Sequence, residues 1–217
     1  MKRRLVMRER QTASAMFGFT RRSIPMRSRW FIVLVVVCMD VPTSAQTTDG
    51  GFDKALSESL AKVANSMHST IRTNLAEAAE AMTEADYAFR PTAEIRTFGQ
   101  LVGHVASANF FFCSQAAAEK PPATENYEAI SNRAALLKGL KDSLSYCDRV
   151  YRSTTDATFN TTVHMSAAPG APATATTRGA ILMFNVAHNN EHYGNVVVYM
   201  RLEGRVPPST ARAQRSK

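Results

Sequence analysis

Apolar residues recur at steps of three and four along four stretches of the chain, the spacing that marks one face of an α-helix. The first stretch runs from about Phe52 to Met82, and the second from about Phe98 to Ala118, where Pro121-Pro122 follows as a stop signal. The apolar face of the first stretch consists of Phe52, Leu56, Leu60, Val63, Met67, Ile71, Leu75 and Ala78. No stretch shows a convincing strand pattern, which would alternate apolar and polar residues.

The third stretch begins near Ser131, a residue suited to cap the start of a helix. The fourth runs from about Thr177 to Glu203, where Gly204 suits a helix C-terminus and Pro207-Pro208 prevents continuation. Residues 153–176, between the two, contain a Pro-Gly-Ala-Pro sequence and are expected to form a long loop. Four amphipathic helices of about 20–30 residues predict an all-α fold, a four-helix bundle.

The N-terminal 45 residues have the three parts of a secretory signal peptide. Basic residues precede the ten-residue apolar run Trp30–Met39, and small residues follow at Thr43 and Ala45. We therefore predict cleavage after Ala45, export to the periplasm or the exterior, and no stable membrane span in the cleaved chain. Two alternatives stay open: an uncleaved N-terminal anchor, and translation that starts at Met26, which makes residues 1–25 an upstream extension.

The positive charge lies mainly outside the predicted bundle. The formal net charge is +8, but residues 1–45 hold nine of the 26 basic residues and only two of the 18 acidic ones. A nearly neutral remainder is a poor surface for nucleic-acid phosphates, so we expect no nucleic-acid partner. We divide the chain into a leader at 1–45, a bundle at 46–206 and a basic C-terminal tail at 207–217, which is expected to be frayed and solvated.

Three of the five histidines are candidate metal ligands. His188 and His192 are four residues apart, so their imidazoles stack on one face of the fourth helix. His104 lies at the edge of the apolar stripe of the second helix and is expected to point inward. Three inward imidazoles leave coordination positions open for water or substrate, the arrangement of a catalytic metal centre. The alternative for His104 is a core residue whose ring nitrogens are satisfied by hydrogen bonds.

Other polar residues of the helices have lesser predicted roles. Asn185 and Asn189 are candidate hydrogen-bond partners of the ligating imidazoles, or else line a solvated helix edge. Glu191 flanks the face that carries His188 and His192 and is expected to be solvated or to support a ligand. His68 is expected to be structural, and His164 to be exposed in the long loop.

The sequence resembles the DinB/YfiT-like superfamily of metalloenzymes. The resemblance covers about residues 52–208 and includes Phe89-Arg90-Pro91. It rests mainly on Phe98-Gly-Gln-Leu-Val-Gly-His104-Val-Ala, on His188-Asn-Asn-Glu-His192-Tyr-Gly194-Asn-Val, and on Tyr199-Met-Arg201-Leu-Glu-Gly204-Arg-Val-Pro207-Pro208. It implies an up-down-down-up four-helix bundle in which His104, His188 and His192 hold one divalent metal. Many members carry a further histidine where this chain has Tyr193, so Tyr193 is another candidate partner of the ligands.

The implied topology agrees with the spacing of the histidines. His104 lies about 14 residues before the end of the second helix, and His188 and His192 lie about 11 and 15 residues after the start of the fourth. In antiparallel helices these positions reach matching heights, because each residue advances the helix by about 1.5 Å.

The same topology implies parallel second and third helices, in which Cys113 and Cys147 lie level and a disulfide is feasible. An up-down-up-down bundle would separate the two cysteines by roughly 15 Å, beyond disulfide reach. Two free, buried thiols are the alternative.

The resemblance implies a metal-dependent hydrolase or thiol-dependent transferase that acts on a small molecule of unknown identity. Zinc is the expected metal for an all-histidine site, with nickel or another first-row ion as alternatives. Export argues mildly against a thiol substrate, since small reducing thiols are a cytoplasmic resource. The alternative function is a non-catalytic exported bundle that binds a ligand or partner. With either function, a homodimer is an open alternative for the assembly of the chain. A dry interior with His104 bonded to the backbone would favour that alternative.

Overall fold

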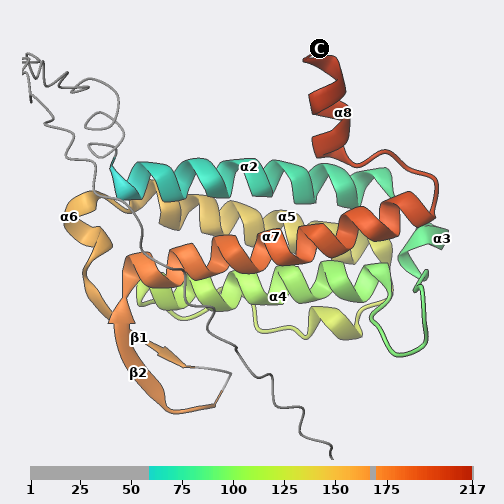
Figure 1. Ribbon diagram of the computed structural model, residues 1–217. Helices are drawn as coiled ribbons and strands as arrows, with labels where there is room; N and C mark the ends of the chain where they lie inside the picture. Colours follow the sequence, from blue (N-terminus) through green and yellow to red (C-terminus); the bar gives the residue numbers. More distant parts are fainter. Residues whose placement is uncertain (1–58, 167–169, 217) are drawn as a thin grey trace, which may run out of the picture. The chain divides into compact units, whose positions relative to one another are not determined.

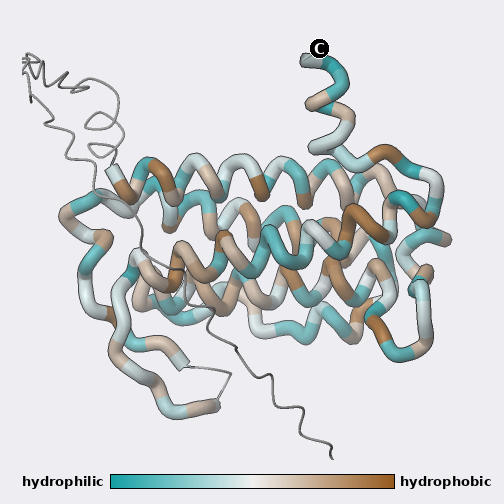
Figure 2. The backbone as a smooth tube through the Cα atoms, viewed as in Figure 1, coloured by the Kyte–Doolittle hydropathy of each residue, from teal (hydrophilic) through white to brown (hydrophobic). Residues whose placement is uncertain are grey.

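The computed structural model describes residues 59–166 and 170–216. The predicted leader and the start of the first predicted helix lie outside these residues. The described chain is mostly helical, and Figure 2 shows hydrophobic and hydrophilic residues alternating along its long helices. The four long helices are α2 (Leu60–Ala81), α4 (Phe98–Ala117), α5 (Arg133–Ser153) and α7 (Arg178–Leu202).

The long helices pack side by side in a closed ring (Figure 1). α4 packs against α5 and α7, and α2 packs against the same two helices on the other side. α2 and α7 run in one direction, whereas α4 and α5 run in the other. Most helix ends lie close to the predicted ones, but α2 begins at Leu60, after Ser59 as its cap, and not near Phe52. Asn132 and not Ser131 caps α5, by accepting a hydrogen bond from the Ala135 amide.

Short elements connect and extend the long helices. They are α3 (Glu84–Tyr87), the 3-10 helix η1 (Tyr127–Ala129), α6 (Asp156–Phe159) and α8 (Pro208–Arg215). α8 corrects the prediction that the basic tail is frayed. Its Ser209 hydroxyl lies 2.9 Å from the Tyr193 hydroxyl, and its Arg212 pairs with Glu77 of α2. The tail is therefore held against the bundle by polar contacts that no local sequence pattern reveals.

Residues 162–166 and 173–177 form two paired strands, a β-hairpin, so the prediction of a long loop without strands is wrong. β1 (Thr162–Ser166) pairs antiparallel with β2 (Ala173–Thr177), and Thr162 lies opposite Thr177. In β1 only Val163 is fully buried, and it packs into the core cluster of α4 and α7. A strand pattern with a single buried position is too weak to detect by alternation.

A layer of buried polar side chains divides the core into two apolar clusters. One cluster contains the apolar residues near the C-terminal ends of α2 and α7, and the other contains those near their N-terminal ends. The layer between them consists of His68, Asn109, Asn185, Asn189 and His192, all buried. This layer sits at the height of the histidine triad.

A disulfide joins Cys113 of α4 to Cys147 of α5, with 5.4 Å between their Cα atoms. Both residues are fully buried in the cluster next to the polar layer. The two helices run parallel, which brings the cysteines level. In the described part of the chain, no helix has the length and hydrophobicity needed to cross a membrane.

Reduction of the disulfide should destabilise the fold. The bond closes a loop with a sequence separation of 34 residues, and a loop of this length restricts the unfolded chain by about 4 kcal/mol in the chain-entropy model. We expect a reductant to lower the free energy of unfolding of the wild-type chain by about 2–4 kcal/mol in urea titrations. A Cys113→Ala/Cys147→Ala variant should respond to urea identically with and without reductant. An unchanged wild-type midpoint under reducing conditions would contradict the assignment.

Candidate metal centre

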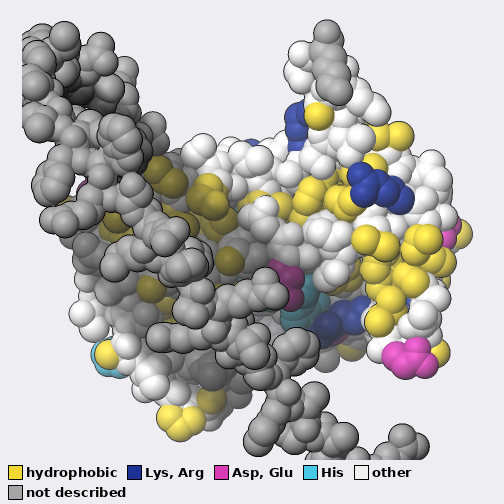
Figure 3. Space-filling model, in the orientation of Figure 1, with side chains coloured by type: hydrophobic (Ala, Val, Ile, Leu, Met, Phe, Trp, Pro, Cys, Tyr) yellow, Lys and Arg dark blue, Asp and Glu magenta, His cyan; other side chains and the backbone are white. Residues whose placement is uncertain are grey.

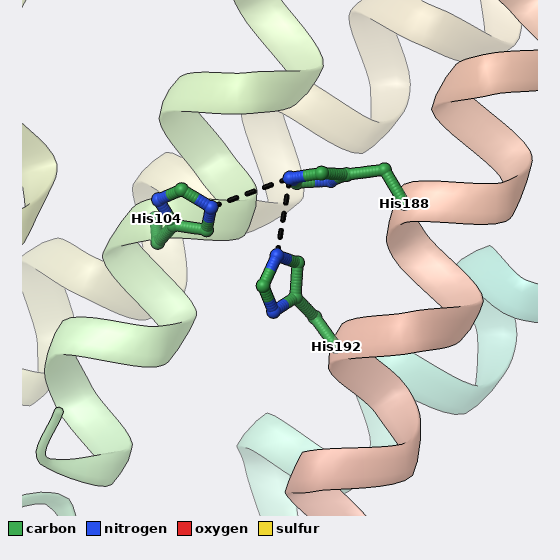
Figure 4. A group of neighbouring side chains, drawn as sticks. All are labelled: His104, His188 and His192. Atoms are coloured by element: carbon green, nitrogen blue, oxygen red, sulfur yellow. Dashed lines mark hydrogen bonds between the residues drawn. The ribbon is translucent and has the colours of Figure 1, made fainter. Parts of the chain in front are cut away.

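His104, His188 and His192 converge between α4 and α7 (Figure 4). Thr97 caps the start of α4 by accepting a hydrogen bond from the Gln100 amide, which places His104 two turns into the helix. His188 and His192 project from successive turns of α7. Figure 4 shows the three rings pointing toward one another, as the spacing of the histidines predicts.

The distances between the ring nitrogens suit one metal ion. The Nε2 atom of His188 lies 3.3 Å from Nε2 of His104 and 3.1 Å from Nε2 of His192. One ligand atom from each of the three histidines lies within 4.8 Å of the others. Tetrahedral zinc with nitrogen ligands at about 2.0–2.1 Å holds those nitrogens about 3.3–3.4 Å apart. The residues present therefore fit a divalent metal.

Glu128 fixes the orientation of His104. Its Oε1 lies 2.7 Å from the His104 Nδ1, so this nitrogen donates a hydrogen bond and Nε2 presents its lone pair to the other two imidazoles. Oε2 accepts a hydrogen bond from Arg96 at 2.9 Å. Burial acts to raise the pKa of Glu128, but the hydrogen bonds from Arg96 and His104 outweigh it and lower the pKa. The carboxylate–histidine pair is a common support for a metal ligand.

Sequence reasoning missed Glu128, which lies 24 residues from His104. It belongs to η1, a short element that no periodicity of apolar residues predicts. η1 reaches the site because it crosses α4 at Gly103, where a Cβ atom would collide with the Tyr127 carbonyl. The glycine in the motif before His104 was the available signal, since it permits a close backbone approach.

Burial favours the neutral imidazole at two of the three histidines. Burial lowers the pKa of His188 to about 4, and the neighbouring His192 and His104 act in the same direction. Burial and His104 likewise lower the pKa of His192. Both rings are therefore neutral near pH 7, and each can offer an unprotonated nitrogen to a metal ion. Converging neutral nitrogens form a donor set for a divalent cation.

Asparagine side chains occupy the polar layer beside the triad. The Nδ2 atoms of Asn185 and Asn189 both donate to Oδ1 of Asn109 at 2.9 Å, and this joins α7 to α4. Asn185 also lies 2.9 Å from the Tyr151 hydroxyl. Asn185 thus serves the helix interface, whereas Asn189 lies near enough to His188 to oppose the fall in its pKa. The solvated helix edge, the alternative for both, is excluded because both are fully buried.

The other polar candidates lie away from the ring nitrogens. Tyr193, expected as a partner of the ligands, instead bonds Ser209 of α8, because its position on α7 faces the C-terminal segment. Glu191 is exposed, and its charge opposes the fall in the pKa of His192. His164 is exposed on β1, as predicted for this residue.

His68 belongs to a separate buried pair. Its Nε2 lies 2.9 Å from Oδ1 of Asp148, and its ring stacks on Tyr151 at 4.1 Å. Asp148 also pairs with Arg72 and Arg152. Burial lowers the pKa of His68 to about 4, although the charge and the hydrogen bond of Asp148 act to raise it. Its Nδ1 is buried without a hydrogen-bond partner in the described residues, so a proton there would have no acceptor.

The triad opens to the surface on one side. The His104 side chain is 25% exposed, and Figure 3 shows a histidine reaching the surface between acidic and basic side chains. On the apolar side, the Phe112 ring contacts the His188 ring edge-on, with 5.4 Å between the ring centroids. The Phe112 ring also contacts the Phe184 ring edge-on, with 5.2 Å between the centroids. A bound metal would therefore keep a position that a small molecule can reach.

Replacement of Glu128 by Gln should weaken metal binding. A glutamine keeps the shape but removes the charge that holds the His104 Nδ1–H, and loss of such a support costs about 10–100-fold in metal affinity. Competition with a chromophoric chelator measures the change. Glu119→Gln, at a surface carboxylate paired with Arg149, should leave the affinity unchanged. Equal affinities in the Glu128 and Glu119 variants would contradict the role of Glu128.

Protonation of His68 should destabilise the protein in acid. Its pKa is lowered from 6.5 in an unperturbed residue to about 4 in the fold, so the unfolded chain binds more protons between these values. Stability is therefore retained above pH 6.5 and falls as the pH drops toward 4, by about 3 kcal/mol from this group. Urea titrations of wild type and His68→Gln should show a smaller loss in the variant over this range. Parallel pH profiles would count against the assignment.

The comparisons with known proteins agree with the geometry. A family model described as the DinB superfamily matches residues 67–196, which include all three histidines. A crystal structure of a DinB-like protein from Bacillus cereus is similar, with a TM-score of 0.54 and 16% identity over 64% of this chain and 89% of that chain. A DinB-like protein from Bacillus subtilis has a TM-score of 0.51 and 17% identity over 66% of this chain and 92% of its own.

No significant match was found among curated proteins. At these identities the solved structures show a shared fold and nothing about activity. The family model, in contrast, spans more than half of the chain. The protein therefore belongs to the DinB superfamily.

Proposed function

We propose that the protein is an exported metalloenzyme whose four long helices form an up-down-down-up bundle and whose triad binds one divalent metal. The observation that carries this proposal is the convergence of three Nε2 atoms from His104, His188 and His192. The helix directions in Figure 1 support the topology. The signal-like sequence of residues 1–45 supports export.

Zinc is the metal we propose, since three imidazoles suit it, and nickel or another first-row ion is the alternative. When bound, such an ion lowers the pKa of a coordinated water or thiol and supplies a nucleophile near pH 7. Glu128 keeps the lone pair of His104 directed at the site. Phe112 shields one flank of His188 from water.

The reaction we propose is hydrolysis or thiol-dependent transfer on a small molecule. The open side of the triad admits a substrate next to the coordinated nucleophile. An oxidising compartment would supply little reduced thiol, which favours hydrolysis. The disulfide between Cys113 and Cys147 is consistent with such a compartment.

The alternative of a non-catalytic bundle predicts His104 bonded to the backbone in a dry interior. In the structure His104 instead bonds the Glu128 carboxylate, faces His188, and is partly exposed. A carboxylate behind the ring and an open side in front of it support a metal centre that a substrate can reach.

Metal content tests the proposed site. Protein purified without a histidine tag should carry about one equivalent of zinc or nickel by inductively coupled plasma mass spectrometry. His104→Ala and His188→Ala should lose this metal because each removes one of three ligands. His164→Ala, at an exposed histidine of β1, is the matched control and should retain it. Full metal content in His188→Ala, or no uptake of added zinc by the wild type, would overturn the proposal.

A further inference from the structure

A pocket of about 550 Å³ lies between α4, the segment 119–127 and β1. We propose that this pocket binds an aromatic group without negative charge, which belongs to a substrate whose reacting end lies at the histidine triad. The proposal rests on the metal-dependent function proposed above and adds the class of substrate. The volume falls within the range of about 300–1,000 Å³ that is typical of small-molecule sites.

The pocket and the triad share one face of α4. Ser107 and Phe111, which line the pocket, follow His104 by three and seven residues, so they lie one and two helical turns from it. The Phe111 ring lies 5.3 Å from the Phe112 ring, which in turn lies 5.4 Å from the His188 ring. An aromatic wall therefore leads from the metal ligands to the pocket. A substrate that spans the two must extend roughly 5–10 Å along the helix.

The walls of the pocket are suited to an aromatic ring. Phe110 and Tyr127 stack with their ring centroids 6.0 Å apart and 24° between their planes, and Phe111 forms a further side. Such faces bind a planar apolar group through offset or edge-on contacts. The opposite rim is held in place because Oε1 of Gln115 accepts a 2.6 Å hydrogen bond from the Ser166 amide.

The polar groups of the pocket disfavour a negatively charged ligand. Among the described residues that line it, only Glu119 and Glu125 are charged, and Glu119 already pairs with Arg149. No lysine or arginine among the lining residues is placed to bind an anion. The Ser107 Oγ is buried without a hydrogen-bond partner in the described chain, so it is free to bond a polar atom of the ligand at the end nearest the triad.

Zinc-binding hydroxamates test the connection between triad and pocket. The full chain, loaded with zinc, is titrated with acetohydroxamate and with ω-phenylalkyl hydroxamates of increasing chain length. The hydroxamate binds the metal, and the phenyl ring reaches the pocket only when the linker is long enough. We expect the best phenylalkyl compound to bind at least tenfold more tightly than acetohydroxamate, since it buries a ring. A para-carboxylate on that ring should remove most of the gain.

Variants separate the pocket from the metal. Ala123→Trp, in the segment that lines the pocket on the side away from α4, fills the pocket and should abolish the gain from the phenyl group while leaving acetohydroxamate affinity unchanged. Phe111→Ser, which removes a wall without adding bulk, should reduce the gain as well. Ser145→Trp, at an exposed serine of α5 in the groove beside α2, is the control and should preserve it.

The outcomes distinguish the two proposals. If acetohydroxamate binds but no phenyl compound binds more tightly, or if Ala123→Trp retains the gain, the pocket assignment is overturned and the metal site stands. If acetohydroxamate does not bind the zinc-supplemented protein at all, the metal site is overturned and the pocket assignment with it.

Discussion

Hydrogen bonds among buried asparagines set the relative position of α4 and α7. Asn109 is fully buried and accepts from both Asn185 and Asn189, so its carbonyl oxygen is satisfied only when the two helices keep one height. An unsatisfied buried amide costs about 1–3 kcal/mol, so a shift of either helix by one turn is strongly disfavoured. Apolar contacts alone would tolerate such a shift better, because they are not directional.

The geometry of the triad follows from that constraint. His104 precedes Asn109 by five residues on α4, while His188 and His192 flank Asn189 on α7. Once the asparagines meet, the three imidazoles are brought to the same height, and their Nε2 atoms converge. The disulfide beside the layer ties α4 to α5, and His68 with Asp148 ties α2 to α5. The polar layer, the disulfide beside it and Asp148 therefore together link all four long helices.

The triad has one buried side and one side that is open to the surface. Burial near the triad keeps the rings neutral, because it lowers the pKa values of His188 and His192. Exposure on the other side of His104 leaves room for a ligand. The aromatic wall from His188 through Phe112 to Phe111 continues this open side toward the pocket. The same arrangement thus provides a protected donor set and a route to it.

Local periodicity by itself determined the four long helices, since an apolar stripe at steps of three and four depends only on neighbouring residues. It also determined that His188 and His192 share a face, and the stripe of the second helix indicated that His104 points inward. The family resemblance implied the same three histidines as the ligand set. These predictions agree with α7 and α4 as the structure has them.

Only the tertiary structure decided the contacts between residues distant in sequence. Glu128 reaches His104 because η1 crosses α4 at Gly103. Tyr193 contacts Ser209 because the chain turns back after α7 and brings the start of α8 to it. β1 has a single buried position, Val163. The β-hairpin forms nevertheless, because Val163 packs against buried residues of α4 and α7. Such contacts leave no periodic trace, because each depends on how separate elements meet in space and not on the spacing of residues along one of them.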